Sequence, residues 1–273
     1  MIVARAIEEA RRGLEPRRGG TIGLVPTMGA LHAGHRSLLD AARGECDTVV
    51  ASVFVNPAQF GPEEDLDRYP RDDASDLAAL EAAGVDLAFL PSAEEMYPPG
   101  FQTWVEVEEL GRGLEGDARP GHFRGVATVC LKLFAIVRPD LAYFGQKDAQ
   151  QAEVVSRLVE DLALEIEVRV IPTVRDDDGL ALSSRNAYLS PEERRAALAL
   201  PRALAAGAEA HRAGTDAAET ARAALRAEPG VRADYVKVAH WNGRAVLVAA
   251  ARVGSTRLID NVVLEGGWDE HDR

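Results

Sequence analysis

Short apolar runs alternate with stretches of helical periodicity over the first two thirds of the chain. The runs are rich in β-branched residues and almost continuously hydrophobic, at 21–26, 48–55, 85–90, 141–144 and 165–171. Such runs are typical of strands buried on both faces. Helical patterns fall between them, at about 35–45, 73–83, 125–137 and 149–162. This alternation predicts βαβ units and a Rossmann-like parallel sheet with helices on both faces, an α/β fold.

The pattern changes in the last third of the chain. A polar stretch at 175–179 precedes an alanine-rich helical region that runs from Pro191 to about Ala227. The segment 233–264 then has the pattern of three short strands separated by turns. We therefore expect a first domain over 1–174 and a smaller α+β domain over 175–273.

Composition indicates a folded chain, and its net charge disfavours some kinds of binding partner. Of 273 residues, 47% are hydrophobic and 27% are charged, which is ordinary for a globular protein. The formal net charge is −13, from 31 basic and 44 acidic side chains. A field of that sign repels phosphate backbones and anionic lipids, so nucleic acid and membrane surfaces are poor partners. A small anionic substrate remains compatible, because a local basic pocket can override the global charge.

Cysteine usage and the N-terminus indicate the compartment. Cys46 and Cys130 lie far apart, so they build neither a disulfide framework nor a cysteine-based zinc site. Arg5 and Glu8 interrupt the N-terminal segment where a signal peptide needs an apolar core. No apolar run approaches the length of about 18 residues that a transmembrane helix needs. We therefore expect a cytoplasmic protein.

One glycine pattern resembles the dinucleotide fingerprint without its context. Gly111, Gly113 and Gly116 match GxGxxG. The fingerprint works only where a strand turns directly into a helix. The residues that follow, from Asp117 to Gly121, are not expected to start a helix. The pattern therefore does not indicate an NAD site.

The segment PTMGALHAGH, residues 26–35, carries candidate chemistry at the end of the first expected strand. Gly29 and Gly34 permit tight turns and close approach of the backbone to a phosphate. His32 and His35 lie at the start of the following helix, whose N-terminus favours negative charge. A histidine N–H there can stabilise charge on a phosphoryl oxygen. The pair is also compatible with zinc ligation, or with ordinary capping and core roles.

Three further segments carry polar side chains suited to a nucleotide and its partner substrate. In GQKDAQQ, residues 145–151, Lys147 suits ATP phosphates and Asp148 suits a ribose hydroxyl or a helix cap. In LSSRN, residues 182–186, hydroxyls and a guanidinium can clamp phosphate. In NPAQFG, Asn56 and Gln59 follow the second expected strand. Each segment also has a plain interpretation as a solvated turn or helix start, but we expect all of them at one edge of the sheet.

Six blocks of the sequence, taken in order, resemble the signature blocks of one family. They are PTMGALHAGH, SVFVNPAQFGP with DLDRYPR, GHFRGVATV, AYFGQKDAQQ, GLALSSRNAYLS and TRLIDN, and they extend over residues 26–261. The family is pantothenate synthetase (pantoate–β-alanine ligase). HAGH is similar to the HxGH motif of the wider nucleotidylyltransferase superfamily, and LSSRN to its KMSKS-like loop. Leu182 stands where many members have Met.

The resemblance implies an AMP-forming carbon–nitrogen ligase of pantothenate biosynthesis, the route to coenzyme A. Such enzymes condense (R)-pantoate with β-alanine, using ATP and Mg²⁺, through a pantoyl adenylate and with release of pyrophosphate and AMP. Family members are typically homodimers that associate through the N-terminal domain. The smaller domain is expected to act as a lid.

The resemblance also implies roles for individual residues. His35, His32 and Lys147 are the expected catalytic residues. Gln59, Gln151 and Asn56 are expected to bind pantoate or β-alanine, and Asp76 is the candidate for positioning Mg²⁺. The expected ATP-binding residues are Met28, Gly29, His32, His35, Gly145, Gln146, Lys147, Asp148, Val174, Leu182, Ser183, Ser184 and Arg185.

Two alternatives stay open at the level of sequence. The HxGH and LSSRN motifs alone also fit a related nucleotidylyltransferase that stops at adenylyl transfer. A catalytically inactive nucleotide-binding regulator is the other alternative. The products separate them, because only the ligase forms free AMP together with an amide.

Overall fold

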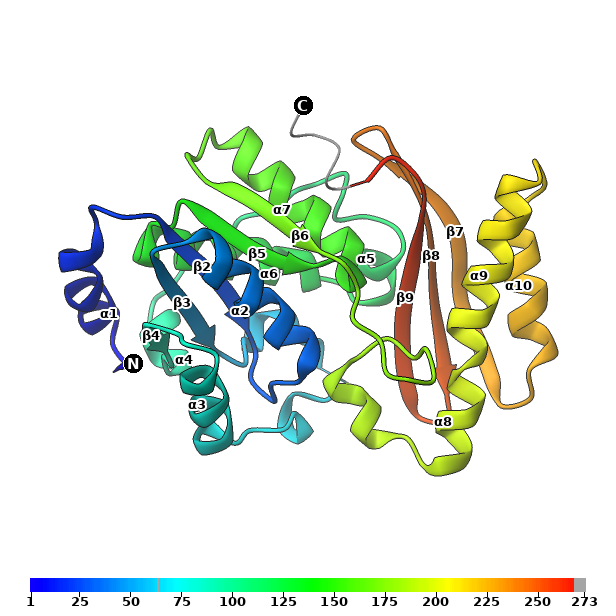
Figure 1. The fold of residues 1–273 in the computed structure, drawn as a ribbon, viewed down its shortest axis with the longest axis horizontal. Coiled ribbons are helices and arrows are strands. Elements are labelled where there is room, and N and C mark those ends of the chain that lie inside the picture. Colours follow the sequence, from blue (N-terminus) through cyan, green and yellow to red (C-terminus); the bar gives the residue numbers. More distant parts are fainter. Residues whose placement is uncertain (63, 268–273) are drawn as a thin grey trace. The chain divides into compact units, whose positions relative to one another are not determined.

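Six parallel strands in the order β1-β4-β3-β2-β5-β6 form the larger sheet of the computed structural model, which describes residues 1–62 and 64–267 (Figure 1). The strands are β1 (Ile2–Ala4), β2 (Ile22–Thr27), β3 (Thr48–Val53), β4 (Leu87–Phe89), β5 (Leu141–Gly145) and β6 (Glu167–Ile171). The strand order reverses between the neighbours β2 and β5. In open parallel sheets, the carboxyl ends of strands at such a reversal are where ligands bind.

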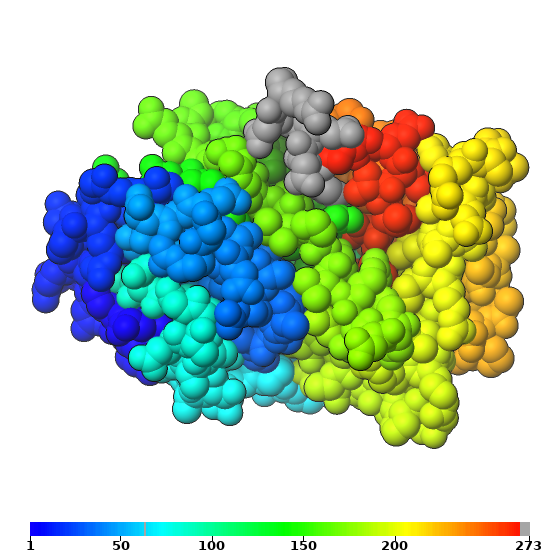
Figure 2. Space-filling model, viewed as in Figure 1, coloured from blue at the N-terminus to red at the C-terminus, as the bar shows by residue number. Residues whose placement is uncertain are grey.

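Helices cover both faces of this sheet, because alternate strand residues point to opposite sides. Leu24 and Val50 pack in one core with α1 (Ile7–Leu14), α6 (His122–Val137) and α7 (Ala149–Asp161). Val25 and Ala51 pack in a second core with α2 (Ala33–Glu45) and α3 (Asp73–Ala82). This part also contains two short helices, α4 (Ala93–Met96) and α5 (Glu115–Ala118). Figure 2 shows the outward side chains of α2 on the surface.

The C-terminal part is a three-stranded antiparallel sheet with helices. Its strands are β7 (Val231–Trp241), β8 (Arg244–Val253) and β9 (Thr256–Glu265), in that order in the sheet. Its helices are α8 (Pro191–Ala197), α9 (Ala199–Arg212) and α10 (Ala217–Ala227). Leu204 and Leu225 share a core with Leu247. A Cβ at Gly207 would lie 2.4 Å from Leu247 Cδ2, so a glycine there lets α9 pack closely on the sheet.

The chain divides into two compact units near the end of β6. The first unit comprises Met1–Gly145 and Gln150–Ile171. The second comprises Gln146–Ala149 and the residues from Pro172 onward. The sequence places a boundary at 174/175, whereas these units divide at 171/172. The short segment 146–149 packs with the second unit because its contacts are with β9.

The expected α/β fold with a smaller α+β part is confirmed, and the structure adds three details. Strand β1 is too short for a recognisable pattern and forms by pairing with β4, far along the chain. The alanine-rich helical region consists of three helices, a number that the sequence pattern did not predict. No helix begins between Asp117 and Gly121, as expected, although the short α5 contains Gly116 and α6 begins at His122. The residues 102–107 before this segment form no strand, so the strand-to-helix context of the fingerprint is absent there.

No helix within the described parts of the chain is both long enough and apolar enough to cross a bilayer.

Candidate active site

The loop after β2 turns sharply before α2 begins. Gly29 has a φ of +82° and Ala30 a φ of +50°, both in the left-handed region. The buried carboxylate of Asp76, on α3, accepts the N–H of Ala30 over 3.0 Å and that of Leu31 over 2.9 Å. A Cβ at position 29 would lie 2.7 Å from Asp76 Oδ2. Gly29 and Asp76 together therefore set the path of the backbone into α2.

The two histidines of the HAGH segment lie at the N-terminus of α2, as expected. His32 is the N-cap, and its Nδ1 accepts the N–H of Gly34 over 3.1 Å. His35 Nδ1 accepts the N–H of His32 over 3.3 Å, and the two ring centroids are 4.1 Å apart. Because both Nδ1 atoms accept, the proton of each neutral ring is assigned to Nε2. Capping and phosphate binding are thus compatible, since each ring caps through Nδ1 and carries a hydrogen on Nε2 that can be donated.

Asn56 and Gln59 form a buried amide pair after β3. The Oδ1 atom of Asn56 accepts the N–H of Ala58 over 3.2 Å and the hydroxyl of Tyr97 over 2.8 Å. Its Nδ2 therefore faces Gln59 Oε1, to which it donates over 2.9 Å. This directs Gln59 Nε2 the other way, to within 3.9 Å of Met28 Sδ. Asn56 consequently orients the amide of Gln59.

Burial keeps the hydroxyl of Tyr97 protonated, because it raises the pKa of this phenol well above its usual value. A protonated phenol is the donor that Asn56 Oδ1 requires.

The GHFRGVATV block supports Gln59 from α6. A Cβ at Gly125 would lie 2.1 Å from Ala58 O, so only glycine lets α6 approach this turn. His122 Nδ1 lies 3.0 Å from Gln59 O, and its Nε2 lies 3.2 Å from Arg119 Nη1. Because a guanidinium can only donate, Nε2 accepts and the Nδ1–H donates to Gln59 O. Arg119 is held in turn by Glu64, with an Nη2–Oε2 distance of 2.6 Å.

Burial, followed by the charge of Arg119, lowers the pKa of His122 to about 4. This side chain is therefore neutral at physiological pH. The sequence predicted no role for His122, although its block GHFRGVATV is one of the six that resemble the family, and none for Arg119, which lies just before that block.

The GQKD segment forms a 3₁₀ turn at Gln146–Asp148, between β5 and α7. Gly145 ends β5, as expected for a segment at a carboxyl end. Lys147 Nζ lies 3.6 Å from Asp148 Oδ2, and the lysine side chain is only 19% exposed. Gln151 is half-buried on α7.

The LSSRN segment lies in the second unit and does not directly follow a strand of the larger sheet. Leu182 N–H donates to Val174 O over 3.0 Å, which closes the loop 174–182. Ser183 Oγ accepts the N–H of Arg185 over 3.3 Å and caps the 3₁₀ helix Ser184–Tyr188. The Ser183 hydroxyl can still donate its own hydrogen, because a hydroxyl donates and accepts at once.

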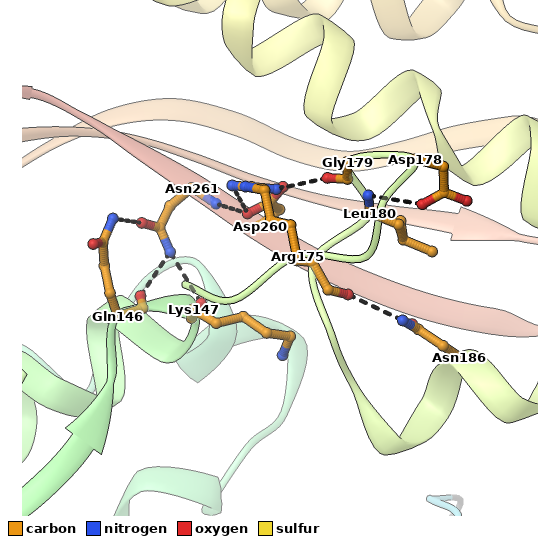
Figure 3. A network of polar contacts seen from close by, with 10 residues as sticks. Gln146, Lys147, Arg175, Asp178, Gly179, Leu180, Asn186, Asp260 and Asn261 are labelled. Atoms are coloured by element: carbon orange, nitrogen blue, oxygen red, sulfur yellow. Dashed lines mark hydrogen bonds and ion pairs between the residues drawn. The ribbon is translucent and has the colours of Figure 1, made fainter. Parts of the chain in front are cut away.

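The expected site residues are divided between the two units. Met28, His32, His35, Asn56, Gln59 and Asp76 belong to the first unit. Lys147, Ser183 and Arg185 belong to the second. The second unit also holds a polar network for which the sequence predicted no role, formed by Arg175, Asp260 and Asn261 around the GQKD turn (Figure 3).

Within residues 1–62 and 64–267, no group of three His, Cys, Asp or Glu side chains is placed to hold a metal ion. Both oxygens of Asp76 already accept backbone N–H groups.

The fold and these motifs match one family over nearly the whole chain. Residues 2–263 match the family described as Pantoate-beta-alanine ligase. The chain belongs to this family. The pantothenate synthetase of Roseiflexus sp. (strain RS-1) is 58% identical to this ligase over 259 residues, covering 90% of this chain and 93% of the relative.

Solved structures of the same family agree. The crystal structure of pantothenate synthetase from Thermus thermophilus is 50% identical, with a TM-score of 0.93, covering 97% of this chain and 100% of that one. The pantoate-beta-alanine ligase from Francisella tularensis, complexed with beta-gamma ATP and beta-alanine, is 36% identical with a TM-score of 0.83. It covers 98% of this chain and 99% of its own. The family resemblance of the six blocks is thereby confirmed.

Proposed function

We propose that this ligase condenses pantoate with β-alanine with consumption of ATP, forming pantothenate, AMP and pyrophosphate. Family membership over residues 2–263 supports the overall reaction. The observation that carries the chemistry is the histidine pair at the N-terminus of α2, with both Nδ1 atoms accepting backbone N–H groups. Two Nε2–H donors at a helix N-terminus are suited to a polyphosphate.

In the first half-reaction, a carboxylate oxygen of pantoate attacks the α-phosphorus of ATP. The bond between this phosphorus and the bridging oxygen breaks, and pyrophosphate leaves with the electron pair. An ionised carboxylate has no proton to remove, so His35 is assigned to stabilise charge on the phosphate oxygens through its Nε2–H. His32 and Lys147 supply a second neutral donor and a cation for the same charge.

The ATP-binding residues remain those that the family motifs indicate. In the first unit they are Met28, Gly29, His32, His35 and Gly145, and in the second unit Gln146, Lys147, Asp148, Val174, Leu182, Ser183, Ser184 and Arg185. Backbone N–H groups, hydroxyls and the Arg185 guanidinium are the donors that phosphate oxygens accept best.

Gln59 and Gln151 are assigned to pantoate. The orientation of Gln59 directs its Nε2 donor away from Asn56, and this donor suits a substrate carboxylate or hydroxyl oxygen. A neutral amide leaves the carboxylate nucleophilic, whereas a bound guanidinium would lower its reactivity. The side chain of Asn56 is occupied by Gln59, Gly125 O, Ala58 N–H and Tyr97, so it acts as a positioning residue.

Magnesium is proposed to accompany ATP on its phosphates. Mg²⁺ bound to nucleotide phosphates usually keeps several waters and needs one or two protein carboxylates at most. When bound, the ion supplies neutralisation of phosphate charge. Asp76 stays a candidate contact, but its two backbone hydrogen bonds support a role in shaping the histidine loop.

In the second half-reaction, the amine of β-alanine attacks the acyl carbon of pantoyl adenylate. The bond from this carbon to the phosphate oxygen breaks, AMP leaves with the electron pair, and the amine proton is released. An acyl adenylate is open to hydrolysis, so the reaction requires that water be excluded until the amine attacks.

Two further features are proposed on family grounds. We expect a homodimer that forms through the first unit, where Ile2, Val3 and Trp104 are exposed apolar side chains. We expect the enzyme to act in the cytoplasm, where ATP is available. Light scattering of the purified protein measures the first, and cell fractionation the second.

The deciding experiment separates the two half-reactions. The protein is incubated with ATP, Mg²⁺ and pantoate, with and without β-alanine, and AMP and pyrophosphate are measured separately. We expect pantoate alone to drive isotope exchange between ATP and pyrophosphate, and β-alanine to be required for AMP release at the full rate. A retained adenylylated product that never reacts with β-alanine would instead identify an adenylyltransferase.

A further inference from the structure

The TRLIDN block ends in two adjacent buried polar residues that the proposed chemistry does not use. Asp260 and Asn261 lie on β9, and each is 2% exposed. Buried polar groups require hydrogen-bond partners, because an unpaired one costs free energy. Their partners lie in the turn that carries Lys147 and in the loop that precedes LSSRN.

Asn261 uses its whole carboxamide on the GQKD turn (Figure 3). Its Nδ2 donates to the carbonyl oxygen of Gln146 over 2.8 Å and to that of Lys147 over 3.0 Å. Its Oδ1 accepts from Gln146 Nε2 over 3.2 Å. One side chain thus holds two successive carbonyls and one side chain of the turn.

Asp260 secures the same strand to the loop that precedes LSSRN. Arg175 donates to its carboxylate through both Nη atoms, over 2.7 and 2.9 Å. The Oδ1 atom of Asp260 also accepts the N–H of Asn261 over 2.8 Å. The backbone of Asn261 is therefore held at the position from which its amide reaches the turn.

This set of contacts requires a carboxamide. Two donor hydrogens and one acceptor oxygen on a short side chain are offered only by asparagine. An aspartate would place a carboxylate oxygen against two carbonyl oxygens, and an alanine would leave both carbonyls and Gln146 without these bonds.

We propose that Asn261 is a positioning residue for Lys147, which holds the turn so that the lysine ammonium reaches the phosphates of ATP. This inference rests on the proposed role of Lys147 in adenylate formation. Lysine is a point charge on a flexible four-carbon stem, so where its ammonium can reach depends on where the backbone starts. A displacement of about 1 Å is enough to cost about 100-fold in rate.

The test uses Asn261→Ala in the full-length enzyme. Pantoate-dependent ATP–pyrophosphate exchange is expected to slow by about 10-fold to 100-fold. Pantothenate formation from pre-formed pantoyl adenylate is expected to stay near the wild-type rate, because the pyrophosphate has already left. An equal loss in both half-reactions would overturn the proposal, since it would indicate a general structural role.

A double-mutant cycle asks whether Asn261 acts through Lys147. In the Lys147→Ala background, Asn261→Ala is expected to change exchange by less than about twofold, because the group that it positions is gone. A full additional loss in that background contradicts the proposal. Asn261→Asp, which keeps the size of the side chain, is measured in parallel. If neither variant folds, Asn261 is structural and the proposal fails.

The matched control is Asp234→Asn on β7 of the same sheet, which removes the charge that pairs with Arg257 at 2.8 Å and with Arg252 at 3.6 Å. Its exchange rate is expected to remain within about twofold of wild type. Measurement of the wild-type enzyme separates failure of the proposed function from failure of the proposed role of Asn261. Absence of pantoate-dependent exchange in the wild type overturns the proposed function, whereas wild-type exchange with an unaffected Asn261→Ala variant overturns only the role of Asn261.

Discussion

The Nδ2 atom of Asn56 donates to Oε1 of Gln59 over 2.9 Å, and this bond decides which end of the glutamine amide is available to a substrate. The orientation of the Asn56 amide follows from its Oδ1 atom, which accepts a backbone N–H that can only donate. A side chain without a substrate contact thereby determines the chemistry that its neighbour presents.

Gln59→Ala and Gln151→Ala are expected to weaken the use of pantoate far more than that of ATP. Loss of one buried hydrogen bond costs about 1–3 kcal/mol, which corresponds to a rise of about 5-fold to 150-fold in the KM for pantoate. Steady-state kinetics with each substrate varied in turn measures the two parameters. Equal changes in the KM values for ATP and pantoate would contradict the pantoate assignment.

Asn56→Ala extends that prediction to the positioning residue. It should raise the KM for pantoate because it releases the amide of Gln59. In the Gln59→Ala background, Asn56→Ala should therefore cause little further rise in that KM. An effect of the same size in both backgrounds would show that Asn56 acts independently of Gln59.

Asp76→Asn is expected to slow adenylate formation by about 10-fold or more. An amide nitrogen would then face one of the two backbone N–H groups of the histidine loop, and a buried unpaired donor costs about 1–3 kcal/mol. The Mg²⁺ concentration that gives half the maximal rate should not change. A large rise in that concentration would instead indicate that Asp76 is a direct ligand.

The matched control for Asp76→Asn lies on the same helix. Asp72 caps α3 by accepting the N–H of Ser75 over 3.0 Å. Asparagine is as good an N-cap as aspartate, so Asp72→Asn should keep wild-type kinetics.

His35→Ala should slow adenylate formation by about 100-fold to 1,000-fold, the usual effect of losing one donor to a developing negative charge. ATP binding should fall less, and pre-formed pantoyl adenylate should still be converted at a near-normal rate. Rapid-quench measurement of each half-reaction tests this. His211→Ala is the control, because His211 pairs with Glu265 in the C-terminal unit. Equal losses in both half-reactions would make His35 structural and transfer the catalytic role to His32 or Lys147.

The stability of the protein should fall as the pH drops from about 6.5 towards 4, in part because of His122. Burial lowers the pKa of His122 to about 4 in the folded state, from the ordinary value of 6.5. The unfolded chain therefore takes up a proton first, so this contribution is complete above pH 6.5 and is lost as the pH falls. A difference of that size corresponds to about 3 kcal/mol.

Denaturant unfolding at several pH values measures this loss, and His122→Gln should remove its share of the pH dependence. An unchanged slope between pH 6.5 and 4 in that variant would show that other groups account for it.

The strands and the histidine segment could be predicted from the sequence because the information is local. β2, β3 and β5 are continuous apolar runs, and such runs form strands wherever helices cover both faces of a sheet. His32 and His35 are three residues apart at a strand-to-helix junction, so their arrangement follows from the start of a single helix. The position of Gly145 at the end of β5, before α7, could likewise be predicted from the local sequence.

The supporting contacts depend on packing between distant segments. Asp76 meets Ala30 across 46 residues of chain, His122 meets Gln59 across 63, and Asn261 meets Gln146 across 115. A hydrogen bond forms only when donor and acceptor come within about 3.2 Å in a favourable direction, and no local periodicity encodes that distance. Blocks such as GHFRGVATV and TRLIDN could be recognised in the sequence. The contacts that Gly125 and Asn261 make could not be predicted from it. Only the folded chain brings α6 against the turn at Gln59 and β9 against the turn at Lys147, because those approaches are set by the packing of whole helices and sheets.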